Sequence, residues 1–282
     1  MEDKGVLKIF IFIVTFLTFI FAQSPLNIIT PLPHDRQKAE IGKMIFFDKT
    51  LSKEGNISCE TCHNLYWEFS GTNKKLTKTD TPTILNAAYN YLFFKDGKVD
   101  NIYKQVEISI TSSKELNTPK DIFINKILEN QKYKKAFYEV YKQLNYETVI
   151  DALVNYEKSL ITPNSKYDNY ISGSTEIFSE SEKRGYFIFN SVGCASCHNG
   201  INLGGNLVVK SSGRFIKVPT LRNLSKTAPY FYDKITSDLK DVLRIKNSDL
   251  ISPLNDQDIE DLYNFLLTLD GYVEYIKNDY ER

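Results

Sequence analysis

The chain has 282 residues, which is enough for one large domain or two small ones. It contains 35 lysines and arginines and 35 aspartates and glutamates, so its formal net charge is zero. This balance gives no support for nucleic acid as a partner, and the ordinary apolar content predicts a packed globular core.

The N-terminal residues have the composition of an export signal. Lys4 and Lys8 precede an apolar run from Ile9 to Ala22, and Ala22 is a suitable cleavage residue. The run is shorter than the roughly 20 residues that a membrane-spanning helix needs. We therefore expect a signal peptide over residues 1–22 and a soluble periplasmic protein. An uncleaved N-terminal membrane anchor is the alternative.

Helical periodicity dominates the first half of the chain. Residues 36–47 repeat apolar side chains at three- and four-residue spacing, which predicts a helix. Asn117 to Pro119 supply a cap and a first-turn proline for another helix. The apolar faces expected downstream are Ile122, Phe123, Ile127 and Leu128, then Phe137, Val140, Tyr141 and Leu144, and then Val149, Leu153, Tyr156 and Leu160, ending near Pro163.

The second half begins with a polar stretch and then repeats the helical layout. Residues 164–179 are rich in serine and polar side chains and are predicted to be a linker. Residues 179–182 form a capping-box pattern that should open a helix. A glycine-rich loop covers residues 200–205. The last amphipathic helix is expected to carry Ile259, Leu262, Tyr263, Leu266 and Leu269 and to stop at Gly271.

All four cysteines of the chain belong to two copies of the pattern Cys-x-x-Cys-His. The copies are Cys59, Cys62 and His63, and Cys194, Cys197 and His198. Thiols at positions one and four lie on one face of a helical turn, where both can form thioether bonds to one haem. The adjacent histidine can then bind the haem iron as its proximal ligand. The sequence therefore predicts two covalently bound c-type haems.

Two other uses of the cysteines are open. A zinc site would fit the ligand chemistry, but zinc ribbons space their cysteine pairs by roughly 15–20 residues, far less than the separation here. Redox or structural disulfides are compatible with an exported protein. Neither alternative explains why a histidine follows each pair.

The residues around both motifs resemble the bacterial dihaem cytochrome c peroxidase family, which includes the enzyme that matures methylamine dehydrogenase. The resemblance is carried by residues 41–48, 51–52, 57–64, 81–88, 96–97, 213–223 and 227–231. It implies a mainly α fold of two cytochrome c-like domains, expected over residues 30–165 and 166–282. It also implies that the N-terminal haem reacts with hydrogen peroxide, and that the C-terminal haem receives electrons from a small cytochrome c or cupredoxin. Family members are often dimers, so a homodimer is a further expectation.

The family resemblance also assigns roles to individual residues. Gln105 and Glu115 match a family glutamine and glutamate that lie above the peroxidatic iron, with the same separation. Cleavage of the peroxide O–O bond requires a proton to move between its oxygens, which a carboxylate can transfer while an amide orients the peroxide. A calcium ion would be bound by Asp80 and by backbone oxygens of Thr227 and Pro229.

The sequence departs from the family in three places. Residues 64–79 contain no histidine, so the second ligand that blocks the N-terminal iron in many members is missing, and we expect an open iron that needs no reductive activation. His34 is expected to be a surface residue.

Lys246 stands where the family has a methionine or tyrosine ligand to the C-terminal iron, and it is a candidate ligand or a plain surface charge. Lys95 replaces a family tryptophan, and the sole tryptophan, Trp67, is expected to serve packing.

The leading prediction is thus an enzyme that reduces hydrogen peroxide to water as a cytochrome-c peroxidase. The first alternative is a dihaem oxidase that modifies a protein substrate. The second is a dihaem electron carrier without catalytic activity. Gln105 and Glu115 favour an enzyme over a carrier.

Overall fold

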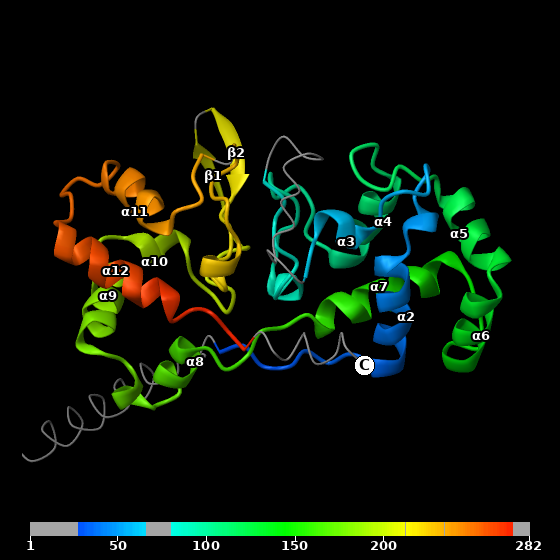
Figure 1. Cartoon of the computed structure of the whole chain (residues 1–282), viewed down its shortest axis with the longest axis horizontal. Coiled ribbons are helices and arrows are strands. Elements are labelled where there is room, and N and C mark those ends of the chain that lie inside the picture. The colour runs from blue at the N-terminus through cyan, green and yellow to red at the C-terminus, as the bar shows by residue number, and fades with distance from the viewer. Residues whose placement is uncertain (1–27, 66–79, 212, 234, 273–282) are drawn as a thin grey trace, which may run out of the picture.

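The computed structural model describes residues 28–65, 80–211, 213–233 and 235–272, and these form two helical units (Figure 1). The first unit contains α2 (Arg36–Phe47), η1 (Lys49–Leu51), α3 (Cys59–Cys62), η2 (Ala87–Tyr89), α4 (Ile102–Thr111), α5 (Lys120–Glu129), α6 (Gln131–Val140) and α7 (Tyr146–Ser159). The second contains α8 (Lys166–Ile171), η3 (Thr175–Ile177), α9 (Glu180–Ser191), α10 (Cys194–Cys197), β1 (Val208–Ser211), β2 (Arg214–Lys217), η4 (Leu224–Lys226), α11 (Leu239–Asn247) and α12 (Asp256–Leu267). Among the described residues, no helix is long and apolar enough to cross a membrane.

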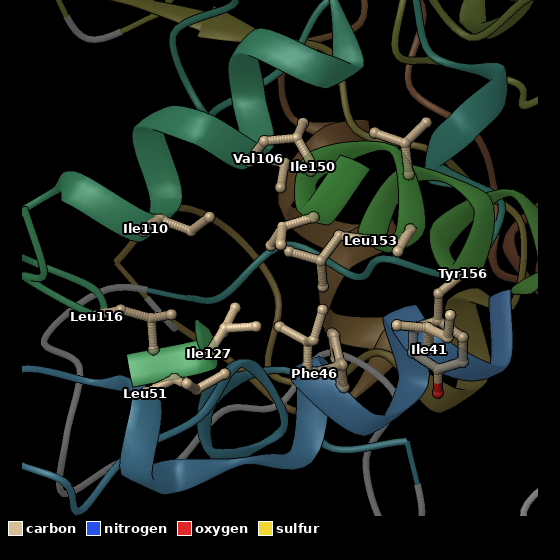
Figure 2. Packing of buried hydrophobic residues seen from close by; sticks show 14 of the residues in the cluster. Ile41, Phe46, Leu51, Val106, Ile110, Leu116, Ile127, Ile150, Leu153 and Tyr156 are labelled. Atoms are coloured by element: carbon tan, nitrogen blue, oxygen red, sulfur yellow. The ribbon is translucent and has the colours of Figure 1, made fainter. Parts of the chain in front are cut away.

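Each unit has its own apolar core. The first core gathers side chains from α2, α4, α5 and α7, with Phe46, Ile110 and Leu153 among those that Figure 2 shows facing one another. The second core is built around Phe265 of α12, which is fully buried against Tyr167, Phe178 and other rings. Separate cores explain why the chain forms two units rather than one layered domain.

The same kind of crossing between two helices occurs in both units. Helix α2 packs on α7 in the first unit, and α9 packs on α12 in the second. A glycine lies at each crossing, and a Cβ atom there would collide with a backbone carbonyl: Gly42 meets Ala152, and Gly185 meets Asp261. The two units therefore share the same close approach of two helices at a glycine.

Several helices agree with the sequence predictions. Helix α2 spans the expected residues and is capped by Asp35, whose carboxylate accepts hydrogen bonds from the Gln37 and Lys38 amides. The capping box of Ser179 and Glu182 opens α9 as predicted. Helix α6 ends at Val140, before Tyr141 and Leu144, and Ile122 of α5 is exposed rather than buried. These two details of the predicted apolar faces were wrong.

The segment predicted to be a linker is partly helical and largely anchored. Ser165 and Asp168 form a capping box that starts α8, and Tyr167 packs edge-on against Phe265. Asp168 also pairs with Arg222, with 2.8 Å between Oδ1 and Nη1, and both side chains are buried. The prediction failed because polar composition was taken as a sign of exposure, whereas these polar groups satisfy one another inside the protein.

An antiparallel hairpin of β1 and β2 faces the first unit (Figure 1). No pattern in the sequence predicted this hairpin. The backbone amide of Lys217 in β2 donates to the Lys95 carbonyl at 2.7 Å, and the amides of Tyr91 and Leu92 donate to the Gly205 carbonyl at 3.1 and 2.9 Å. These bonds connect the two units directly, next to the site described below.

Candidate active site

A cavity of about 660 Å³ lies between α3, α4 and the hairpin of the second unit. Its size falls within the range of pockets that hold small molecules and cofactors. Both cysteines and the histidine of the first motif line it, together with the two predicted catalytic residues. Residues from the second unit, including Phe215, Lys217 and Tyr232, complete the wall. The structure therefore brings the predicted haem attachment and catalytic residues into one chamber.

The first motif forms a single helical turn, α3. The Ser58 amide donates to Thr61 Oγ1 at 2.9 Å, which fixes the start of the turn, and the His63 amide donates to the Cys59 carbonyl at 2.8 Å. Cys59 and Cys62 are both free thiols. Burial raises the pKa of Cys59 to about 12, so the group remains a thiol rather than a thiolate. Two free thiols on one turn, facing a cavity, fit thioether attachment of haem c.

His63 is held in the form that a metal requires. Burial lowers its pKa to about 4, against the opposing effect of the nearby Pro82 carbonyl, so the imidazole is neutral near pH 7. Its buried Nδ1 atom makes no hydrogen bond to any described residue. A buried, neutral imidazole that directly follows the two thiols fits the role of iron ligand.

Glu115 and Gln105 are connected through Ser109. The Gln105 side-chain amide donates to Ser109 Oγ at 3.0 Å, one turn along α4. Glu115 follows the end of α4, where its amide donates to the Ser112 carbonyl at 3.0 Å, and its carboxyl is hydrogen-bonded to Ser109. Burial raises the pKa of Glu115, and the hydrogen bond with Ser109 partly opposes that rise. The site thus has a desolvated carboxyl and an oriented amide beside the motif.

Sequence reasoning missed two members of this site. Ser109 lines the cavity between the predicted pair, and it lies four residues after Gln105, a spacing that could have identified it. Glu157 of α7 also lines the cavity and is only 8% exposed. Burial, reinforced by the negative charge of Glu115, raises the pKa of Glu157 to about 8. In the sequence, Glu157 could have been recognised as a glutamate on the otherwise apolar face of a predicted helix.

The second motif repeats the first on α10. Gly193 precedes it with a positive φ of 94°, and the His198 amide donates to the Cys194 carbonyl at 2.9 Å. Nδ1 of His198 lies 3.2 Å from the Leu203 carbonyl oxygen. Because a carbonyl only accepts, Nδ1 carries the hydrogen and Nε2 is left for a metal. Burial lowers the pKa of His198, so this imidazole is also suited to bind iron.

Lys246 lies on the exposed side of α11. Its Nζ atom is 3.3 Å from Asp249 Oδ2 and 5.8 Å above the Phe231 ring. Its positive charge is close enough to lower the pKa of His198. The structure therefore places Lys246 near the second motif but in a surface ion pair, and ligation by Lys246 stays a prediction.

The predicted calcium residues come from two segments that meet. The Asp80 amide donates to the Tyr232 carbonyl at 3.2 Å, which brings Asp80 beside the segment that contains Thr227 and Pro229. No group of three His, Cys, Asp or Glu side chains in the described ranges could hold a metal ion. A calcium site here would depend on backbone oxygens, and it stays a prediction.

Tyr232 lies where the two units meet, beside Lys95. The Lys95 ammonium lies 4.6 Å from the centre of the Tyr232 ring, and the Arg214 guanidinium lies 5.2 Å from it. His34 is half-buried, with Nδ1 2.9 Å from the Leu32 carbonyl oxygen. Trp67 and the loop residues 66–79 lie outside the described residues.

The chain matches two family models. Residues 36–176 match the model for di-haem cytochrome c peroxidase, and residues 182–270 match the model for cytochrome c. These matches confirm haem c as the type of cofactor. Solved structures agree on the fold: a MauG-like protein associated with microbial copper homeostasis superposes with a TM-score of 0.74 at 19% identity, over 89% of this chain and 95% of that one. The predicted mainly helical fold is confirmed.

Named relatives point to the same family. The cytochrome c551 peroxidase of Nitrosomonas europaea is 30% identical over 88% of this chain and 83% of its own length, and that of Pseudomonas aeruginosa is 31% identical over 85% and 80%. The methylamine utilization protein MauG of Methylophilus methylotrophus is 26% identical over 88% and 87%. The predicted enzyme class, a cytochrome-c peroxidase, is confirmed by these relatives. The chain belongs to the di-haem cytochrome c peroxidase family.

Proposed function

We propose that this protein is a periplasmic peroxidase that reduces hydrogen peroxide to two molecules of water, using two protons and two electrons from a small redox protein. The observation that carries the proposal is that Gln105, Ser109 and Glu115 line the same cavity as Cys59, Cys62 and His63. A haem bound at this motif supplies the redox centre at which peroxide is reduced. The remaining steps are performed by side chains of the chain itself.

Glu115 moves the proton. Its deprotonated carboxylate accepts a proton from one peroxide oxygen and donates it to the other, which then leaves as water. The raised pKa of Glu115 brings it closer to neutral pH, where a group can both accept and donate. Gln105 orients the peroxide by hydrogen bonding, and Ser109 fixes the Gln105 amide at 3.0 Å.

Electrons enter through the second unit. The motif of Cys194, Cys197 and His198 offers a neutral, oriented imidazole as an iron ligand. The sequence predicts no catalytic acid like Glu115 beside this motif, so we assign it to electron transfer. A small cytochrome c or cupredoxin is the proposed donor. A homodimer and the calcium ion at Asp80, Thr227 and Pro229 are parts of the proposal that rest on the family resemblance.

Steady-state turnover of hydrogen peroxide with a reduced small cytochrome tests the proposal. Glu115→Gln should lower kcat/KM by a factor of about 10² to 10⁴, the range for loss of a general acid–base group. Glu107→Gln on the neighbouring helix α4 is the matched control, because Glu107 does not line the cavity. Full activity in Glu115→Gln would overturn the assignment.

The same preparation separates the alternatives. An electron carrier would accept electrons from the cytochrome without consuming peroxide. A protein-modifying oxidase would consume peroxide slowly in this assay and leave an oxidised aromatic residue in a co-purified partner.

A further inference from the structure

Lys217 has an unusual environment for a lysine. It is half-buried at the end of β2 and lines the cavity next to the first motif. Its ammonium group makes no hydrogen bond or ion pair with any residue that the structure describes. Burial alone lowers the pKa of Lys217 to about 8. A desolvated cation without a counter-ion is costly, so the environment indicates that an anion belongs beside it.

Neighbouring cations on the same wall are already engaged. Lys98 pairs with Asp96 at 2.8 Å, and Arg214 pairs with Asp233 at 3.6 Å. Lys95 lies over the ring of Tyr232. Lys114 also lines the cavity, but its side chain is exposed. Lys217 thus differs from the other cations near the cavity in combining partial burial with a charge that has no described partner.

The backbone fixes Lys217 in place. Its amide donates to the Lys95 carbonyl at 2.7 Å, and its strand position pairs with Val208 of β1. Lys217 belongs to the second unit, while Cys59 and Cys62 belong to the first. A group that occupies the cavity would therefore contact both units at once.

We propose that Lys217 binds a propionate carboxylate of the haem attached at Cys59 and Cys62, and so links the cofactor of one unit to the hairpin of the other. A haem carries two carboxylates, and a carboxylate held inside a cavity requires a cation or hydrogen-bond donors. Lys217 supplies the missing charge from the wall formed by the second unit. The inference rests on haem at the first motif and not on peroxide turnover.

The test is an electron-paramagnetic-resonance-monitored redox titration of the purified holoprotein, which follows each haem separately. Lys217→Gln keeps a polar side chain but removes the charge. Without that charge the propionate stabilises the oxidised iron more strongly, so the reduction potential of the N-terminal haem should fall. The C-terminal haem should keep its potential and serves as an internal reference.

Two further variants make the test decisive. Lys217→Arg keeps the charge and should retain the potential of the unaltered protein. Lys210→Gln removes an exposed charge from the partner strand of the same hairpin and should also leave the potential unchanged. An unchanged potential in Lys217→Gln would overturn the proposal, as would an equal fall in Lys217→Arg or in Lys210→Gln. Haem content, measured by absorbance, shows independently whether the first motif is loaded.

Discussion

The Gln105 side-chain amide donates a hydrogen bond to Ser109 Oγ at 3.0 Å, and this bond fixes the amide that is proposed to orient peroxide. Ser109 is also hydrogen-bonded to the Glu115 carboxyl, where it favours the ionised form. A single hydroxyl therefore orients the amide and lowers the pKa of the Glu115 carboxyl, against the larger effect of burial. Ser109 acts as a positioning residue.

Ser109→Ala should shift the pH dependence of peroxide reduction. Burial raises the pKa of Glu115 and Ser109 opposes that rise, so removing the hydroxyl should raise the pKa further. Because Glu115 must be deprotonated to accept a proton, kcat/KM should rise with pH, and in the variant that rise should occur at higher pH. A pH profile of kcat/KM checks this. An activity loss that is equal at all pH values would show that Ser109 does not tune Glu115.

Glu157→Gln should stabilise the protein at alkaline pH. The pKa of Glu157 is about 8 in the folded protein, whereas an unfolded glutamate titrates near about 4.3. The unfolded state therefore releases this proton first, and the natural protein loses stability as the pH rises between these values. Glutamine does not ionise, so the variant should be more stable by roughly 1–3 kcal/mol at pH 8 and nearly unchanged at pH 4. Chemical denaturation of the holoprotein at both pH values measures the difference; a pH-independent effect would contradict it.

Arg222→Met should destabilise the second unit. It removes one partner of a buried ion pair and leaves the Asp168 carboxylate uncompensated, which costs about 3–5 kcal/mol in comparable cases. The double variant Arg222→Met with Asp168→Asn should recover part of that loss. Arg244→Met, which removes an exposed ion pair on α11, is the control and should change stability by less than about 1 kcal/mol. Equal losses in Arg222→Met and Arg244→Met would contradict the structural role of the buried pair.

The oxidised protein should show an open N-terminal iron. The sequence has no histidine between residues 64 and 79, where the family resemblance leads one to look for a second ligand to this iron. We expect a high-spin or water-ligated signal from the N-terminal haem before any reduction, and peroxide turnover without a reductive activation step. Paramagnetic resonance of the fully oxidised protein measures this. A six-coordinate low-spin signal from that haem would contradict the expectation.

The sequence predicted those parts of the molecule that depend on neighbouring residues. The α2 helix, the capping box of α9 and the two Cys-x-x-Cys-His turns each require only local spacing, and all four form as expected. The placement of Gln105 and Glu115 beside the first motif followed from family resemblance, since nothing in their local sequence marks them as site residues.

The parts that sequence reasoning missed depend on contacts between distant residues. Helix α8 is anchored because Asp168 meets Arg222, which is far away in the chain, and polar composition alone gives no sign of that pairing. The roles of Glu157 and Lys217 arise from burial against a cavity whose walls come from both units. A periodic pattern shows which face of a helix is apolar, but it does not show which polar group that face encloses.

The most direct test of this account is the intact mass of the exported, purified protein, combined with its absorption spectrum. We expect a polypeptide carrying two covalently attached haems, one at Cys59 and Cys62 and one at Cys194 and Cys197. A colourless protein with the mass of the bare polypeptide, or one that carries a single haem, would contradict it.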